Sequence, residues 1–152
     1  MLSTESLAIG EMFREAMRAR YGEAELSSRF RAFDTICSAT QDRQDAVIHL
    51  LEDQTLDLMV VIGGYNSSNT CNLARICHDT VPTYHIASPE GLESATHVRH
   101  REVTSKSEIV TAGWLPAAGP LTIGITSGAS TPDNLVEQAI RRLDAFANGA
   151  RS

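Results

Sequence analysis

The sequence lacks any run of Lys and Arg, and its formal net charge is -6 at pH 7. Phosphate backbones repel an acidic chain without a basic patch, so generic nucleic-acid binding is disfavoured. No apolar stretch approaches the length of a membrane span, because the longest apolar run is only Leu58 to Ile62. We therefore expect neither nucleic acid nor a membrane as a partner.

Features of secreted proteins are missing as well. The first residues are amphipathic and acidic, without the basic start, apolar middle and small-residue cleavage site of a signal peptide. The three cysteines, Cys37, Cys71 and Cys77, form no CxxC motif, which argues against a self-contained zinc site. A chain without a secretion signal usually keeps its thiols reduced, so we predict a cytoplasmic location.

What is present suits one globular domain over residues 1–152, with 42% apolar and 21% charged residues and no internal repeat. Helical spacing of apolar residues predicts four helices: about 9–17 with a stop at Gly22, about 46–51, one from about 68, and about 135–143. A short segment at 30–36 and the polar stretch from Ser88 to Trp114 have no clear pattern.

Three short apolar runs predict strands at Leu58–Ile62, Thr83–Ile86 and Leu121–Thr126. Strands that alternate with helices are typical of an α/β fold. We therefore predict a three-layer domain with a mostly parallel sheet and helices on both faces.

Two of the predicted strands are followed by loops rich in hydroxyl groups, one from Gly63 to Thr70 and one from Thr126 to Asp133. Ligands of such sheets bind at the carboxyl ends of the strands, where the amino termini of helices favour an anion. Glycines in both loops allow the backbone to turn tightly or approach a ligand. Ser67, Ser68 and Asn69 can donate to a phosphate, and Ser130 or Thr131 is placed as a helix cap or phosphate donor.

Helix capping is the alternative explanation of both loops. Ser, Thr and Asn are preferred caps, and Pro132 suits the first turn of a helix. Taken singly, each loop is better explained as a helix cap than as a ligand site. Because two such loops occur, capping and anion binding become about equally good explanations. Neither loop is a Walker sequence or a GxGxxG motif, so a nucleotide is not indicated.

Cys37 precedes a predicted helix, where a thiolate is favoured as a metal ligand or nucleophile. A small buried residue is the ordinary alternative for a lone cysteine. Cys71 and Cys77 are expected to pack in the core. His97 and His100 are expected to face solvent as a surface pair.

Three stretches in family order resemble the LytB/IspH family of 4-hydroxy-3-methylbut-2-enyl diphosphate reductases. The signature around the last cluster cysteine of that family resembles DTICSATQDRQDAV, and its diphosphate-binding loop resembles GGYNSSNT. Its final serine-bearing loop and helix resemble GITSGASTPDNLVEQ. The residues of these stretches look closest to the plant and cyanobacterial branch of the family, and the resemblance runs from Met1 to about Ala147.

The resemblance implies an oxidoreductase of isoprenoid biosynthesis that removes the hydroxyl of 4-hydroxy-3-methylbut-2-enyl diphosphate. Family members use a [4Fe-4S] cluster held by one cysteine from each of three α/β domains, with an electron donor such as ferredoxin or flavodoxin. The residues carried over by motif are Cys37 as the third cluster ligand and Ser67, Ser68, Asn69 and Ser130 as diphosphate ligands.

The same resemblance implies that this is the carboxy-terminal domain only, without the two amino-terminal domains that carry the other cysteines and the proton donor. We therefore expect a truncated or split reductase that is inactive alone and has no catalytic residue of its own. A separate chain that supplies the missing domains would be its partner. The alternatives are a stand-alone diphosphate-binding module, an inactive relic without a cluster, or an assembly subunit.

Overall fold

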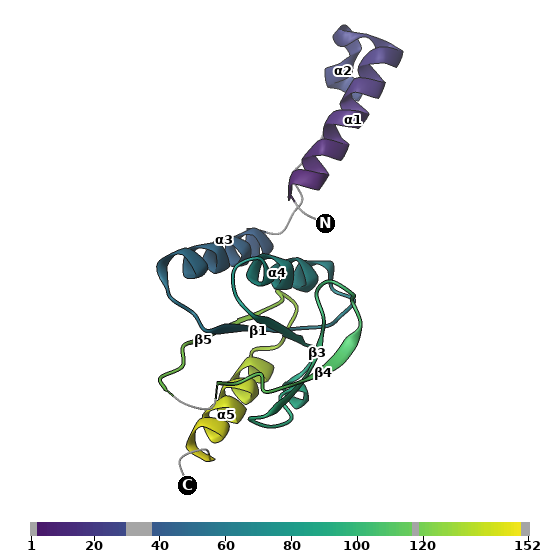
Figure 1. Ribbon diagram of the computed structural model, residues 1–152. Coiled ribbons are helices and arrows are strands. Elements are labelled where there is room, and N and C mark those ends of the chain that lie inside the picture. The colour runs from purple at the N-terminus through teal and green to yellow at the C-terminus, as the bar shows by residue number, and fades with distance from the viewer. Residues whose placement is uncertain (1–2, 30–37, 117–118, 150–152) are drawn as a thin grey trace. The chain divides into compact units, whose positions relative to one another are not determined.

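The computed structural model describes residues 3–29, 38–116 and 119–149, and it divides the chain into two compact units, residues 1–41 and 42–152 (Figure 1). The sequence pattern was interpreted as one α/β domain over residues 1–152. The α/β architecture belongs to the second unit, and the first unit is helical. The predicted segment at 30–36 and Cys37 lie outside the described residues.

The first unit contains α1 (Ser3–Tyr21) and α2 (Glu23–Arg29). The predicted stop at Gly22 is confirmed: its φ of +79° suits glycine, and its N–H donates to the Arg18 carbonyl at 2.9 Å. Helix α2 was not predicted, because its seven residues are too few to show a helical period.

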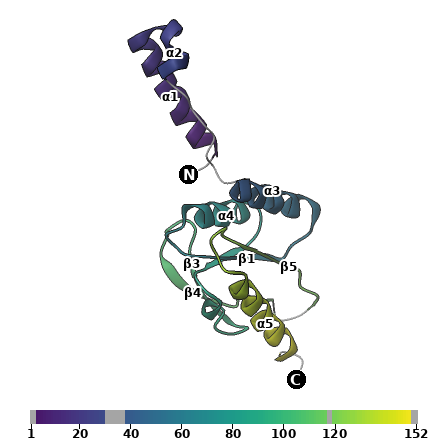
Figure 2. The same ribbon diagram turned by 180° about the vertical axis from the view of Figure 1, so that it is seen from behind.

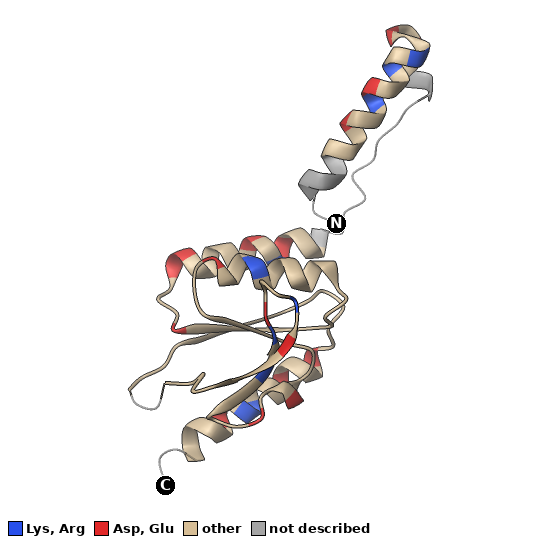
Figure 3. Ribbon diagram, turned by 45° about the vertical axis from the view of Figure 1, so that its right-hand side comes forward, with Lys and Arg blue, Asp and Glu red and all other residues tan. Residues whose placement is uncertain are grey.

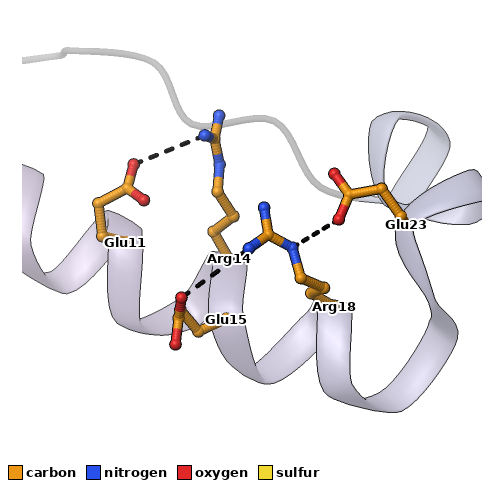
Figure 4. A network of polar contacts seen from close by, with 5 residues as sticks. All are labelled: Glu11, Arg14, Glu15, Arg18 and Glu23. Carbon is orange, nitrogen blue, oxygen red and sulfur yellow. Dashed lines mark ion pairs between the residues drawn. The ribbon is translucent and has the colours of Figure 1, made fainter.

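Ion pairs line the outside of this helical unit (Figure 4). Arg14 pairs with Glu11 at 3.8 Å, and Arg18 pairs with Glu15 at 3.9 Å and with Glu23 at 2.6 Å. All five side chains are exposed, so water and salt screen each pair and its contribution to stability is small. The Arg18–Glu23 pair does, however, join α1 to α2.

The second unit carries the sheet and its helices. Its elements are α3 (Ser38–Asp53, within this unit from Asp42 onward), β1 (Leu58–Ile62), α4 (Ser68–His78), β2 (Thr83–Ile86), the 3-10 turn η1 (Pro89–Gly91), β3 (His97–Arg101), β4 (Glu108–Ala112), β5 (Ile123–Ser127) and α5 (Asp133–Gly149). The predicted β1 and β2 have the observed bounds. The polar stretch from Ser88 to Trp114, for which the sequence predicts no element, forms η1, β3 and β4.

The strand order is β4-β3-β2-β1-β5. Strand β1 pairs in parallel with both β2 and β5, whereas β3 is antiparallel to β2 and to β4. The predicted α/β sheet, parallel at its centre, is therefore confirmed, with an antiparallel extension at one edge.

Strand β1 lies between α5 on one face of the sheet and α3 and α4 on the other (Figures 1 and 2), and all five of its residues are buried. Leu58, Val60 and Ile62 pack on the α5 side. Met59 and Val61 pack on the side of α3 and α4. Because successive strand residues point to opposite faces, an unbroken apolar run is what a doubly covered strand requires. The predicted helices on both faces are confirmed.

The charged residues of this unit lie on its helices, on β3 and β4 and in its loops, and none lies on β1, β2 or β5. Figure 3 shows acidic and basic residues on α3 and α5, whereas β1 carries none. Among the described residues, no helix is both long enough and apolar enough to span a membrane.

Candidate functional site

Strands β1 and β5 end level with each other. The register pairs Ile62 with Ser127, the last residues of the two strands. The loop from β1 to α4 and the loop from β5 to α5 therefore start side by side at one edge of the sheet. Both helices begin at this edge, so the positive ends of their dipoles lie there.

The first loop places Ser67 as the amino-terminal cap of α4. The Ser67 Oγ accepts hydrogen bonds from the Thr70 N–H at 3.3 Å and from the Thr70 hydroxyl at 3.0 Å. Helix capping is thus a real function of this serine. A hydroxyl has two acceptor lone pairs and one donor proton, so the Ser67 proton remains available for an anion. The first turn of α4 contains no acidic residue that would oppose one.

The second loop is tied to the end of β1. The Ile62 carbonyl accepts from the Gly128 N–H at 3.0 Å and from the Thr131 hydroxyl at 3.1 Å. The Thr131 hydroxyl therefore donates its proton within the fold. This contact does not support the prediction of Thr131 as a phosphate donor. Ser130, its neighbour, is exposed.

Two glycines let these loops touch. A Cβ on Gly63 would lie 2.8 Å from both the Thr70 and Thr131 hydroxyls, and a Cβ on Gly128 would lie 2.2 Å from the Thr70 hydroxyl. The buried Thr70 side chain thus fills the space between the loops. The two loops form one packed unit rather than two separate helix caps.

Arg43 adds a positive charge at this edge. Its guanidinium donates to the carbonyl of Ser127 at 3.3 Å and to the hydroxyl of Ser127 at 3.1 Å. It comes from α3, which follows Cys37 in the sequence. The contact joins α3 to the end of β5.

The structure brings the predicted diphosphate ligands onto these two joined loops. Ser67 and Asn69 are half-buried, and Ser68 and Ser130 are exposed. Their roles as ligands stay predictions. Thr70 and Arg43 were not predicted, since nothing in the local pattern shows that the Thr70 side chain reaches Gly128 or that the Arg43 side chain reaches Ser127.

Three further side chains support the first loop from β2, β3 and α4. The Gly63 carbonyl lies 2.9 Å from the Nε2 atom of His85, and the Tyr65 carbonyl accepts from the Arg101 guanidinium and, at 3.3 Å, from the Cys71 thiol. A carbonyl can only accept, so the His85 Nε2 carries the proton. These residues were not predicted as part of a site.

Burial perturbs two groups here. Burial raises the pKa of Tyr65 to about 12, and a hydrogen bond to Glu108 and the charge of that carboxylate add to the increase. Burial also lowers the pKa of His85 below its usual value, and the positive charge of Arg101 adds to this effect. Tyr65 is therefore neutral at physiological pH, and His85 favours its neutral form.

His100 corrects one prediction. It was expected to face solvent with His97, but His100 is buried, lies edge-on to Tyr84 and bonds the Thr111 hydroxyl through Nε2 at 2.8 Å. Burial lowers its pKa. It is buried because alternate residues of β3 point into the core, and His100 occupies one of those positions. His97 is exposed, as predicted.

These two histidines predict an acid-sensitive fold. Both have a pKa below the value of 6.5 that they take up on unfolding, so the unfolded chain binds more protons as the pH falls past 6.5. The free energy of unfolding will be highest above pH 7 and will fall towards pH 5. Urea titrations from pH 5 to 8 will show a flatter pH dependence for His85→Gln and for His100→Gln. An unchanged slope in both variants contradicts this prediction.

Cys71 and Cys77, the two cysteines among the described residues, differ in their surroundings. Cys77 is fully buried, and burial raises the pKa of its thiol to about 12, which disfavours the thiolate that iron prefers. Cys71 contacts the Tyr65 carbonyl and Arg101. Within residues 3–29, 38–116 and 119–149, no three His, Cys, Asp or Glu side chains gather as a set of metal ligands. The packing role predicted for Cys77 agrees with its place in the core.

Comparisons with known proteins agree with this architecture. The family model described as LytB protein matches residues 3–144. The 4-hydroxy-3-methylbut-2-enyl diphosphate reductase of Gloeobacter violaceus is 49% identical over 144 residues, which are 94% of this chain and 34% of the relative. The reductase of the same name from Trichormus variabilis is 45% identical over 147 residues, which are 96% of this chain and 36% of the relative.

A solved structure gives the same result. It is described as (E)-4-hydroxy-3-methyl-but-2-enyl diphosphate reductase, the terminal enzyme of the non-mevalonate pathway, and it is 31% identical with a TM-score of 0.53. The match covers 89% of this chain and 40% of that one. The chain spans about a third of the length of the curated relatives described above. By its family model, its relatives and its fold, the chain belongs to the LytB family.

Proposed function

We propose that this chain is the diphosphate-binding part of a 4-hydroxy-3-methylbut-2-enyl diphosphate reductase. The names of its relatives support the reaction, and the family motifs support the residues. In this proposal Ser67, Ser68, Asn69 and Ser130 bind the diphosphate. The reaction itself, a reductive dehydroxylation in isoprenoid biosynthesis, belongs to the complete reductase.

The observation that carries the proposal is the joining of the two loops. Thr70 fills the space between Gly63 and Gly128, and the second loop is bonded to the last carbonyl of β1. The amino termini of α4 and α5 therefore lie at the same edge of the sheet, with serines from both loops beside them. Free N–H groups and hydroxyls at a helix terminus suit a phosphate group.

An iron–sulfur cluster would supply the electrons of the reaction, and Cys37 is the residue proposed to bind it. The described residues offer no set of ligands for a cluster, and Cys37 lies outside them. The remaining ligands are proposed to come from the other two family domains, for which a partner chain is the proposed source. A donor such as ferredoxin or flavodoxin and a cytoplasmic location remain part of this proposal.

A stand-alone diphosphate-binding module is the second candidate. It is favoured by the fact that both loops and their supports come from this chain alone. Such a module would bind the diphosphate and leave the substrate unreduced. Activity in the presence of the partner chain separates the two candidates.

Titration with pyrophosphate tests the binding that both candidates share. Without other domains to bury the ligand, we expect a Kd of about 1 mM. The Ser67→Ala/Ser68→Ala variant will bind at least about tenfold more weakly, because it loses two donors to the anion. Heats of binding and amide shifts measured at fixed pH and salt will report the difference.

Two controls separate binding from folding. Ser107→Ala removes an exposed hydroxyl between β3 and β4 and should bind like the wild type. Ser68→Ala alone leaves the Ser67 cap of α4 intact, so its loss of affinity cannot come from fraying of the helix. Equal affinity in the wild type and the double variant would remove the diphosphate assignment.

A further inference from the structure

One row of polar side chains crosses the sheet beneath the β1–α4 loop. The register pairs Val61 with His85, His85 with Arg101, and Arg101 with Glu108. Neighbours in such a row point to the same face of a sheet. Val61 packs on the α4 side, so the row lies on the face where the loop begins.

Two members of the row hold two carbonyls of the loop. His85 Nε2 donates to the Gly63 carbonyl at 2.9 Å. The Arg101 guanidinium donates to the Tyr65 carbonyl, and its Cζ lies 5.9 Å from the centroid of the Tyr65 ring. Arg101 is itself fixed, because its Nε donates to the Lys106 carbonyl at 3.0 Å.

These contacts determine where the next N–H groups point. In a planar trans peptide the N–H lies opposite the carbonyl of the preceding residue. Holding the Gly63 and Tyr65 carbonyls towards the row therefore turns the N–H groups of Gly64 and Asn66 away from it. Gly64 and Asn66 are exposed, and neither N–H has an acceptor among the described residues.

We propose that Arg101 and His85 are positioning residues of the diphosphate site. By holding two carbonyls they present the N–H groups of Gly64 and Asn66, next to Ser67, as preformed donors to the anion. This inference rests on the proposed function. Donors fixed before binding lose less conformational freedom, so affinity depends on the support beneath the loop as well as on the ligands.

Arg99 provides a matched control on the same strand. It carries the same charge as Arg101 and, two residues away on β3, lies on the same face of the sheet, but it pairs with Glu93 at 2.8 Å. Arg99→Met and Arg101→Met therefore remove the same formal charge. Only Arg101→Met removes the hydrogen bond to the loop.

The test is a pyrophosphate titration of the full chain followed by amide NMR. We expect Arg101→Met and His85→Leu to raise the Kd by about fivefold or more, and Arg99→Met to stay within about twofold. Arg101→Lys, which keeps a donor and the charge, should recover part of the loss. In Arg101→Met, the Gly64 and Asn66 amide resonances should lose their shift on adding pyrophosphate.

The outcomes distinguish this role from the proposed function. Wild-type binding with unchanged affinity in Arg101→Met and His85→Leu would overturn the positioning role and leave the function standing. Equal losses in Arg99→Met and Arg101→Met would also overturn it, because charge alone would explain them. Absence of wild-type binding would overturn the proposed function and the positioning role together.

Discussion

Gly63→Ala is expected to lower the free energy of unfolding by about 2–4 kcal/mol and to abolish pyrophosphate binding. Gly63 has a φ of +152°, which a side chain disfavours. Its Cβ would also meet the Thr70 and Thr131 hydroxyls at 2.8 Å. Because both threonines join the two loops, relieving this clash separates the loops and displaces their serines.

Gly149→Ala, in the last turn of α5 and outside both loops, is the matched control for that experiment. No heavy atom lies within 4 Å of a Cβ at Gly149, and this residue has no positive φ. The variant should change stability by less than about 1 kcal/mol and should still bind pyrophosphate. Urea unfolding and the titration described above measure both quantities. A Gly63→Ala variant with wild-type stability and affinity would contradict the packed junction of the two loops.

Anaerobic reconstitution with iron and sulfide is expected to leave the purified chain without a stable cluster. The [4Fe-4S] cluster that the family resemblance implies would need three cysteine ligands, and this chain is proposed to supply Cys37 alone. Cys77 cannot replace a missing ligand without unfolding, because it is fully buried in the core between the sheet and α4. Bound iron and sulfide should remain well below one cluster per chain.

Cys37→Ser provides the reference for nonspecific iron. The wild type and Cys37→Ser should retain equal, small amounts of iron after desalting. Adding a partner chain that contains the other two family domains should produce a brown complex with the wild type only. A stable, brown wild-type chain in the absence of any partner would contradict this prediction.

The sequence predicted the parallel centre of the fold well. Strand β1 buries both faces, so all five of its residues are apolar and its bounds stand out. Strand β3 was missed because its run, His97–Arg101, buries only alternate residues, and one of these is a histidine. Strand β4 is largely exposed, so it has almost no hydrophobic signal. Its place in the sheet depends on pairing with β3, which no local pattern reveals.

The candidate site was predictable to the level of its loops. Glycines and hydroxyl residues follow β1 and β5 in the sequence. Both loops could be predicted from them, because each loop begins where a recognisable apolar strand ends. The functions of Thr70, Thr131 and Arg101 depend on contacts with residues 30 or more positions away. A residue type shows which hydrogen bonds a side chain can make but not with which partner. A hydroxyl that bonds another loop therefore cannot be distinguished in the sequence from one that binds a ligand.

Because β1 and β5 end at the same level, the amino termini of α4 and α5 lie at one edge of the sheet, and this placement determines the distance over which an anion is attracted. The chain as a whole has a net charge of -6, so at long distance it repels an anion. Dipoles of α4 and α5 act only close to their first turns, and the Debye length at physiological ionic strength is about 8 Å. Attraction is therefore confined to the rim where the two helices start, and moderate salt would weaken the surrounding repulsion more than it weakens the contact itself.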